Sequence, residues 1–323
     1  MEIKTIETGY SLVESFKKSR DVFSDKRGFG HALVIAGSPG MMGAAVLAAG
    51  GALRSGCGLV TACIPESERF ILQISHPSAI VSCYQGAAFT VSVDRLGYYT
   101  AVGAGCGLGQ SAASADALSG LLSSIRSMSG DRPGLLLDAD ALNIIASHPS
   151  MYENIPSDSI LTPHVRELGR LMRGLYGNCH DEKKFSGRPT GLPPFGQCCF
   201  EDWRYPWSGP EMAYLADMAD RLSSVIVAKG HNTLICPPSK MGDKSRSRTV
   251  YVNTTGNAGM AKGGSGDVLA GLVTGLMARG YSPAEAAILG VWYHGRAGDD
   301  AAKKLGLESM NSSDILDNIH IMS

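Results

Sequence analysis

The sequence predicts an α/β fold in which a mostly parallel sheet has helices on both faces. From Gly30 onward, short apolar runs alternate with glycine-containing loops and with longer segments of helical character. The apolar runs are nearly continuous, which is typical of strands buried on both faces of a parallel sheet. With 323 residues, of which 44% are hydrophobic and 18% charged, the chain can bury a large core. We therefore expect a single domain over residues 1–323, with an insertion at about 177–209.

The individual elements are expected where apolar runs meet residues that end them. Runs such as HALVIA, GLLL and VIVA are rich in aliphatic and β-branched residues and stop at glycine, aspartate or lysine. The expected strands are 31–36, 58–63, 98–102, 134–137, 159–161, 225–228 and 233–236. The expected helices are 43–54, 114–128, 211–222 and 268–279. In sheets of this kind ligands bind beyond the carboxyl ends of the strands, where the polar residues of this chain collect.

The composition argues against several classes of partner and location. A net charge of −1 gives no reason to expect a nucleic acid or an anionic membrane as partner. No run approaches the ~18 apolar residues of a membrane span, and residues 1–20 lack the apolar core of a signal peptide. The eight cysteines are scattered through core-like segments, which is typical of reduced thiols. We therefore expect a cytoplasmic protein.

The segment from Asn257 to Asp267 carries the strongest chemical signal. Its glycines precede a helical run, and a glycine-rich helix start leaves N–H groups free to hold an anion. The expected anion hole consists of Gly263, Gly264, Ser265 and Gly266. We expect Asp267 to be the base that takes a proton from a substrate hydroxyl. The alternative, a plain capping carboxylate, does not account for the crowded glycines.

A second motif, Lys229 to Thr233, lies between two expected strands. A lysine at the carboxyl end of a strand, followed by Gly230, suits a nucleotide phosphate or ribose. The alternative is an ordinary β-turn with a solvated lysine, and the motif alone does not decide between them. The segment does not match the phosphate-binding pattern Gly-x-x-x-x-Gly-Lys-Ser/Thr.

Further polar and glycine-rich segments also follow expected strands. We expect one of Asp138 and Asp140 to cap a helix and the other to organise a magnesium ion through water. The position of His164 favours a ligand contact over a purely structural role. The glycine loops at 37–43 and 105–109 are either tight turns or contacts for phosphate or nicotinamide. Neither loop has the dinucleotide fingerprint GxGxxG with a downstream acid, so the sequence does not indicate a dehydrogenase.

The insertion at 177–209 shows no sustained periodicity and interrupts a helix-rich stretch. It carries several prolines and aromatic residues, among them Trp203 and Trp207, and aromatic residues are enriched at interfaces. We expect an ordered lid or interface arm, and the alternative is a disordered surface loop. The adjacent Cys198 and Cys199 do not have the CxxC spacing of metal sites, so no metal site is assigned.

Taken together, these motifs resemble the ADP/ATP-dependent NAD(P)H-hydrate dehydratases, which have a carbohydrate-kinase-like domain of the ribokinase-like superfamily. The matching segments occur in the family's order between residues 28 and 298. They are Gly37-Ser38, Gly43-Ala44-Ala45, Leu53-Arg54-Ser55-Gly56 with Gly58-Leu59-Val60, Gly105-x-Gly107-Leu108, Asp138-Ala139-Asp140-Ala141-Leu142, Leu161-Thr162-Pro163-His164, Lys229-Gly230-x-x-Thr233, Asn257 and Gly263-Gly264-Ser265-Gly266-Asp267. The last of these alone indicates only the superfamily, whereas the other segments together are more specific. The resemblance implies a ribokinase-like three-layer fold.

The resemblance also implies that two sets of residues divide the ligands between them. The hydrated nicotinamide nucleotide would contact Ala44, Gly107, His164 and Asp267. The adenine nucleotide would contact Lys229, Gly230, His231, Asn232, Thr233 and Gly266. The implied reaction is phosphorylation of the C6 hydroxyl of (S)-NAD(P)H-hydrate by ADP or ATP, with Mg²⁺ as cofactor, followed by loss of phosphate to give NAD(P)H.

Some features depart from the family's pattern. Val165 and Arg166 stand where Pro-Gly usually follows the Leu-Thr-Pro-His segment, Cys106 replaces a proline, and the 177–209 insertion is additional. The epimerase domain that is fused in many relatives is not found in this sequence, so a separate NAD(P)H-hydrate epimerase is expected as pathway partner. The resemblance also implies a homo-oligomer, with a tetramer as one possibility.

Two other functions remain open from the sequence. A ribokinase-like kinase of a vitamin precursor, such as hydroxymethylpyrimidine or hydroxyethylthiazole, would share the anion hole and Asp267. A non-catalytic nucleotide-binding protein would use the insertion as an interaction arm, although an intact Asp267 argues against this. The sequence does not decide between ADP and ATP, or between the hydrates of NADH and NADPH.

Overall fold

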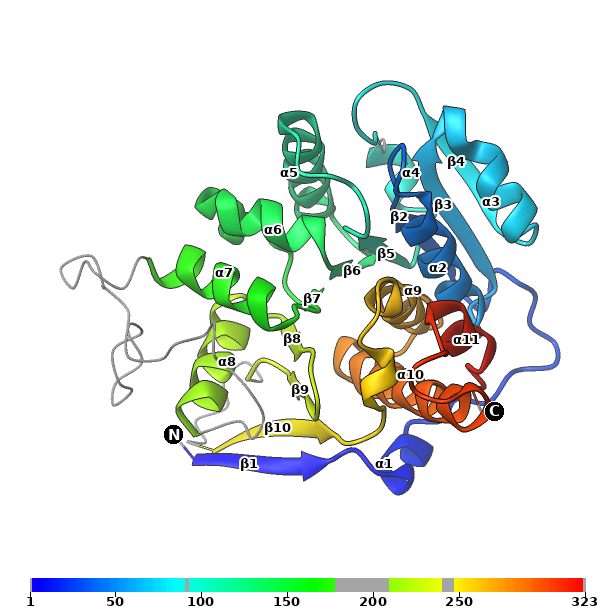
Figure 1. Ribbon diagram of the computed structural model, residues 1–323. Helices are drawn as coiled ribbons and strands as arrows, with labels where there is room; N and C mark the ends of the chain where they lie inside the picture. The colour runs from blue at the N-terminus through cyan, green and yellow to red at the C-terminus, as the bar shows by residue number, and fades with distance from the viewer. Residues whose placement is uncertain (1, 91–92, 178–208, 240–246, 322–323) are drawn as a thin grey trace.

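The computed structural model describes residues 2–90, 93–177, 209–239 and 247–321. These residues form three layers, with a β-sheet between two layers of helices (Figure 1). The expected α/β fold is therefore confirmed. The insertion expected at 177–209 lies almost entirely outside the described residues, together with its cysteines and tryptophans.

Within the described residues, ten strands form one sheet in the order β1-β10-β9-β8-β7-β6-β5-β2-β3-β4. Neighbouring strands are parallel, except that β9 runs antiparallel to β8 and β10. The expectation of a mostly parallel sheet is thus confirmed. The strand bounds are β1 Glu2–Glu7, β2 His31–Ile35, β3 Leu59–Pro65, β4 Ile80–Tyr84, β5 Ala101–Ala104, β6 Gly134–Leu137, β7 Ile160–Leu161, β8 Val225–Ala228, β9 Thr233–Cys236 and β10 Ser247–Asn253.

Helices cover both faces of the sheet (Figure 1). One face carries α4 (Val93–Leu96), α5 (Ala112–Ser127), α6 (Asp140–Ser147), α7 (Val165–Tyr176) and α8 (Gly209–Arg221). The other carries α1 (Tyr10–Ser15), α2 (Met42–Leu53), α3 (Arg69–Ser75), α9 (Ser265–Ala278), α10 (Pro283–Leu305) and α11 (Ser312–Asp317). Successive strand residues face opposite layers, so Leu33 packs under α5–α8 while Val34 packs under α2 and α9. In the part of the chain that is described, no helix is both long and apolar enough to span a bilayer.

The boundary of β5 differs from the expected one for a local reason. The strand was expected to begin at Tyr98, but it begins at Ala101. The N–H groups of Tyr98 and Tyr99 donate to the carbonyl oxygens of Arg95 and Leu96 at 3.1 Å, in a turn that follows α4. Those two N–H groups therefore do not pair with a neighbouring strand, and β5 begins after them.

Several parallel strands end at the same edge of the sheet. The register pairs Ile35 of β2 with Ala104 of β5, and Ala104 with Leu137 of β6. It then pairs Leu137 with Leu161 of β7, and Leu161 with Ile226 of β8. The loops that follow these five strands consequently meet at one edge, which is where parallel α/β sheets bind their ligands.

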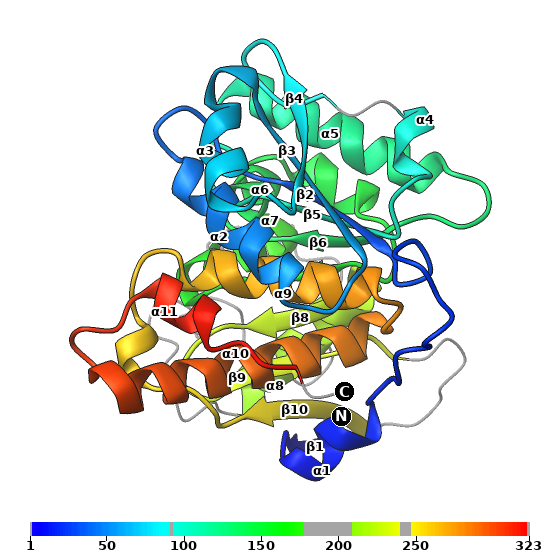
Figure 2. The same cartoon turned by 90° about the vertical axis from the view of Figure 1, so that its right-hand side faces the viewer.

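Helix α9 is held beside this edge because it packs closely on α2 (Figure 2). A Cβ at Gly271 would lie 1.8 Å from the carbonyl oxygen of Ala48, and a Cβ at Gly51 would lie 2.3 Å from that of Val268. Both positions therefore require glycine for the helices to touch backbone to backbone. This contact places the first turn of α9 against the loops at the strand ends.

Candidate functional site

The first turn of α9 is where the sequence predicted an anion site. Its N-cap is Gly264, which has a φ of 90° and no capping side chain. A Cβ at this position would lie 2.4 Å from Cδ1 of Leu47, so both the backbone conformation and the space demand glycine. The N–H groups of the following turn have no intrahelical acceptor and point outward with the positive end of the helix dipole. The N–H of Ser265 donates to the carbonyl oxygen of Lys262 at 3.4 Å, and the anion hole expected at residues 263–266 stays a prediction.

Asp267 is the third residue of α9, so it lies in the first turn and is not the N-cap. Its carboxylate is partly buried, and this burial raises the pKa of Asp267 above the usual range. A hydrogen bond from the Cys106 thiol opposes that increase, and the nearby charge of Asp138 adds to it. A carboxylate with a raised pKa beside free N–H groups can accept a proton from a hydroxyl that attacks an anionic group.

Lys229 lies at the turn between β8 and β9, and its side chain is mostly buried. The alternative of a β-turn with a solvated lysine is therefore right about the turn and wrong about the lysine. Its Nζ donates to Oδ1 of Asp138 at 2.7 Å, and its side chain is 18% exposed. Burial alone would lower the pKa of Lys229, but the carboxylates of Asp138 and Glu167 outweigh burial and raise it. The ammonium group therefore stays charged beside the first turn of α9, where a Cβ on Gly266 would lie 3.3 Å from Nζ.

His164 combines a structural role with an exposed position at the site. Its Nδ1 accepts hydrogen bonds from the N–H groups of Arg166 (3.1 Å) and Glu167 (3.4 Å), so it caps α7. Glu167 completes the capping box, because its Oε2 accepts from the N–H of His164 at 2.9 Å. Burial, reinforced by the charge of Lys229, lowers the pKa of His164 to about 4. The ring is neutral at physiological pH, with its proton on Nε2.

Asp138 and Asp140 do not behave as the sequence predicted. The N-cap of α6 is Ala139, and no side chain caps this helix, so the expectation that one aspartate is the cap was wrong. Asp138 is instead paired with Lys229. Asp140 accepts from the N–H of Gly109 at 2.8 Å and from Nε2 of Gln110 at 2.9 Å, and thereby holds the glycine loop after β5. The two carboxylates are engaged by protein partners, an arrangement that gives no support to a magnesium ion held by either.

The glycine loops after β2 and β5 touch each other. A Cβ on Gly107, which has a φ of 66°, would lie 2.9 Å from Cβ of Ala44. The N–H of Gly37 donates to the carbonyl oxygen of Cys106 at 2.8 Å, and Ser38 Oγ donates to that of Gly107 at 2.8 Å. Gly107 thereby lies against Ala44 of α2, and Cys106, the residue before it, is close enough to Asp267 to influence its pKa.

A cavity of about 750 Å³ opens on the other side of the first turn of α9. Its lining includes every residue that the resemblance assigned to the adenine nucleotide, together with His164. The lining also contains the anion-site residues Gly263 and Ser265. The assigned residues are Lys229, Gly230, His231, Asn232, Thr233 and Gly266. The structure therefore brings together segments that are far apart in the sequence.

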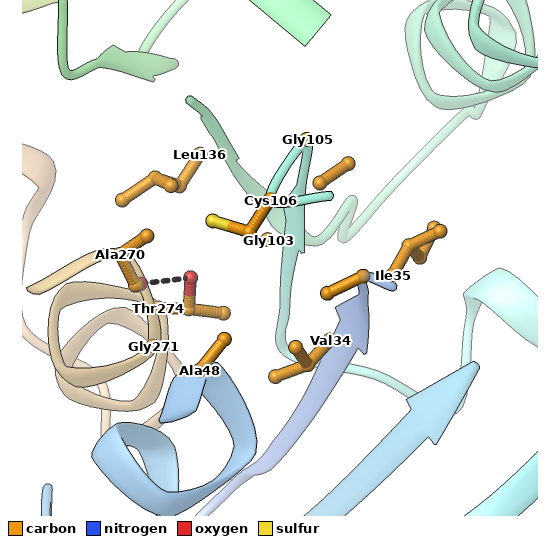
Figure 3. Close-up of a pocket in the computed structure, with 12 residues that line it drawn as sticks. Val34, Ile35, Ala48, Gly103, Gly105, Cys106, Leu136, Ala270, Gly271 and Thr274 are labelled. Atoms are coloured by element: carbon orange, nitrogen blue, oxygen red, sulfur yellow. Dashed lines mark hydrogen bonds between the residues drawn. The ribbon is translucent and has the colours of Figure 1, made fainter. Parts of the chain in front are cut away.

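A second, very small cavity of about 10 Å³ lies beneath Cys106 (Figure 3). It is apolar, and the Cys106 sulfur points into it between Leu136 of β6 and Ala270 of α9. Thr274 turns its Oγ1 to the carbonyl oxygen of Ala270 at 2.7 Å and leaves its methyl group on the lining. The space is too small for a substrate, so it is a packing defect behind the site.

Sequence reasoning did not single out three side chains that shape this region. Asp299 accepts from the N–H of Gly256 and from Nδ2 of Asn257, both at 3.0 Å, and so fixes the loop that leads to the anion site. His294 lines the large cavity behind Ser265, and its burial lowers its pKa to about 4. Glu167 is 5% exposed and completes the cap at His164. Asp299 and His294 belong to one long helix, α10, and only the fold brings His294 to the cavity and Asp299 to the loop at Gly256.

The described residues contain no group of three or more histidine, cysteine, aspartate or glutamate side chains arranged to hold a metal ion. A magnesium ion often uses only one or two carboxylates together with the phosphates of its nucleotide.

Comparison with known proteins decides the family. A sequence model of the NAD(P)H-hydrate dehydratase family matches residues 32–320. The chain belongs to this family. The match covers the strand-end loops and α9, and hence all the site residues described above.

Relatives and solved structures agree with this result. The ADP-dependent (S)-NAD(P)H-hydrate dehydratase of Neisseria meningitidis is 32% identical over 90% of this chain and 83% of its own. The bifunctional NAD(P)H-hydrate repair enzyme of Moorella thermoacetica is 31% identical over 92% of this chain. The chain spans only 50% of that relative, and 52% of the corresponding enzyme of Coxiella burnetii.

The fold also matches solved structures. The ADP/ATP-dependent NAD(P)H-hydrate dehydratase of Bacillus subtilis, co-crystallised with ATP and Mg²⁺, superposes with a TM-score of 0.71. It is 26% identical, and the match covers 97% of this chain and 95% of the other. A ribokinase-like superfamily protein of Enterococcus faecalis, 23% identical, shares the fold with a TM-score of 0.70 over 98% of this chain and 94% of its own. The ribokinase-like fold expected from the sequence is confirmed.

Proposed function

We propose that this chain dehydrates (S)-NAD(P)H-hydrate to NAD(P)H, with ADP or ATP as phosphoryl donor. One observation carries the proposal beyond family membership. Asp267, a carboxylate with a raised pKa, lies in the first turn of α9, next to two groups of loops. One group lines a cavity large enough for a nucleotide, and the other brings Gly107 against Ala44.

The two ligands would occupy these two regions. The adenine nucleotide would fill the large cavity, with its phosphates directed toward Lys229 and the N–H groups at Gly266. The hydrated nicotinamide ring would lie near Ala44 and Gly107, and neutral His164, which lines the large cavity, would contact it from the nucleotide side. Transfer requires the substrate hydroxyl and the terminal phosphoryl group to meet within about 3–3.5 Å of each other, and Asp267 would lie beside that point.

The chemistry then follows in two steps. Asp267 takes the proton of the C6 hydroxyl while that oxygen forms a bond to the terminal phosphorus, and the bond from phosphorus to the bridging oxygen of the nucleotide breaks. The lone pair of the ring nitrogen expels phosphate from C6, and loss of a proton from C5 restores the ring double bond. The net change is dehydration, and the nucleotide leaves one phosphate shorter.

The protein's own residues supply positioning and charge stabilisation in this scheme. The first-turn N–H groups of α9 and the Lys229 ammonium are positive and surround the place where charge develops on the migrating phosphoryl group. We infer that Mg²⁺ enters as part of the nucleotide complex, since the described carboxylates near the cavity already have protein partners. Bound to the phosphates, the ion would add to the neutralisation of their charge.

The bifunctional relatives suggest which reaction precedes this one. They are bifunctional repair enzymes, and the present chain matches about half of their length. We propose that an epimerase supplies the S form of the hydrate to this site.

The proposal is tested by incubating the protein with NADH hydrate and either ADP or ATP. We expect the near-ultraviolet absorbance of the reduced nicotinamide ring to return only when a nucleotide is present. A protein that leaves the hydrate unchanged but phosphorylates hydroxymethylpyrimidine or hydroxyethylthiazole would show that it is a vitamin-precursor kinase instead.

A further inference from the structure

The Lys229–Asp138 ion pair is the most buried charged contact at the site. Asp138 follows β6 and its side chain is 2% exposed, while Lys229 follows β8, with β7 between the two strands. The atoms Nζ and Oδ1 are 2.7 Å apart. Removing two charges from water is costly, and such pairs are often no more stable than apolar residues of the same volume. Stability alone therefore does not explain the pair.

The pair is directed at the first turn of α9. A Cβ on Gly266 would lie 3.3 Å from Nζ of Lys229 and 3.7 Å from Oδ2 of Asp138. Glycine at this position therefore leaves the space between the ammonium and the helix N–H groups open. Asp267, the next residue, is influenced by the charges of both partners. The ammonium group is thus fixed next to the proposed base and to the anion site.

The backbone after Asp138 is bent in a way that separates two carboxylates. Ala139 has a φ of 49° and a ψ of −118°, a conformation usually occupied by glycine, in a tight turn closed by the N–H of Ala141 on the carbonyl oxygen of Asp138 at 3.1 Å. Such strain persists only where surrounding contacts enforce it, and it is common at active sites. Here it directs Asp138 toward Lys229 and Asp140 toward the loop at Gly109.

We propose that Asp138 is a positioning residue that aims the ammonium group of Lys229 at the phosphoryl group in transit. Asp138 touches neither substrate, and it acts only through Lys229. Without it, the charge of Glu167 still favours the ammonium form of Lys229, but the long side chain adopts several rotamers. The proposal rests on the proposed function of the site, because it assigns Lys229 to the transfer step.

The proposal is tested by a double-mutant cycle with Asp138→Asn and Lys229→Met. In Asp138→Asn we expect kcat to fall about tenfold or more, the effect of one misplaced charge-assisted hydrogen bond, while the Kd of the nucleotide changes by less than about threefold. In the Lys229→Met background, Asp138→Asn should change kcat by less than about twofold. The double variant removes both buried charges at once, so it should fold even if Asp138→Asn does not. Its kcat relative to Lys229→Met alone then still tests the proposal, because a change beyond about twofold would show that Asp138 acts without Lys229.

Asp140→Asn is the matched control, since it changes a neighbouring aspartate that holds the Gly109 loop instead of Lys229. We expect it to raise the KM for the hydrate and to show no coupling with Lys229→Met. Two results would overturn the proposal: wild-type kcat in a folded Asp138→Asn variant, or the same loss of kcat from Asp138→Asn with and without Lys229. If the wild-type protein showed no dehydration at all, the proposed function would fail. Calorimetric binding of ADP to the same variants would still report whether Lys229 contacts the nucleotide.

Discussion

Replacement of Asp267 with Asn removes the proposed base and leaves the shape of the side chain almost unchanged. The residue lies in the first turn of α9, directly after Gly266, which lines the large cavity. A positioned general base contributes a factor of about 10²–10⁴ in rate, equivalent to roughly 2.7–5.4 kcal/mol of activation free energy. We therefore expect turnover to fall by about 10²–10⁴.

The fold should tolerate this substitution. Burial, together with the charge of Asp138, raises the pKa of Asp267, so the folded protein holds this proton more tightly than the unfolded chain. The stability linked to the proton is complete below the unfolded pKa and is lost as the pH rises through the folded pKa. At neutral pH the burial of the ionised carboxylate therefore lowers the free energy of unfolding. The attraction of the carboxylate to the helix start offsets this loss by about 0.3–1 kcal/mol. We expect a free energy of unfolding within about 1 kcal/mol of wild type.

Initial rates of NADH recovery measure the effect on turnover. Thermal unfolding and calorimetric titration with ADP confirm that the variant is folded and binds its nucleotide. A folded, nucleotide-binding Asn variant with wild-type turnover would refute the assignment of Asp267 as the base.

The remaining predictions concern binding, pH dependence and packing. Lys229→Ala should raise the nucleotide Kd about tenfold through loss of a charge-assisted hydrogen bond, and calorimetry should show the affinity for the hydrate nearly unchanged. Cys106→Ala removes a hydrogen bond that lowers the pKa of Asp267, so the acid limb of the kcat/KM profile should move to higher pH. Cys106→Ser should return the limb to its wild-type position. If the limb stayed in place in both variants, the Cys106 thiol would have no influence on the pKa of Asp267. Gly271→Ala puts a Cβ 1.8 Å from the Ala48 carbonyl oxygen and should cost about 1–3 kcal/mol of stability in denaturant titrations. Gly120→Ala, with nothing within 4 Å, is its control and should stabilise α5 by roughly 0.5–1 kcal/mol.

Local sequence patterns predicted the central part of the fold well. β6, β8 and β9 occupy the expected residues, because each is a short apolar run with a clear polar or glycine stop. β1, β4 and β10 were not expected, since they lie at or next to the edges of the sheet and mix polar with apolar residues. Their strand character comes from pairing with distant partners, such as β1 with β10.

The residues of the site were easier to predict than their contacts. Asp267 and the glycines before it were found because a glycine-rich helix start is a local pattern. The burial of Lys229 was not predictable, because its partner Asp138 is distant in the sequence and only the parallel register of β6, β7 and β8 brings the two together. The capping function of the Asp138 segment was predicted wrongly for a related reason. Both aspartates have partners outside α6 that compete with its N–H groups.

The most direct test of the central claim is a product balance in a single reaction containing the protein, NADH hydrate and ADP. Phosphoryl transfer followed by expulsion of phosphate predicts equal amounts of NADH, AMP and inorganic phosphate, with no phosphorylated hydrate remaining at completion. Formation of NADH without consumption of ADP would contradict a phosphoryl-transfer mechanism. Accumulation of a stable phosphorylated hydrate without NADH would show that the site is a kinase and not a dehydratase.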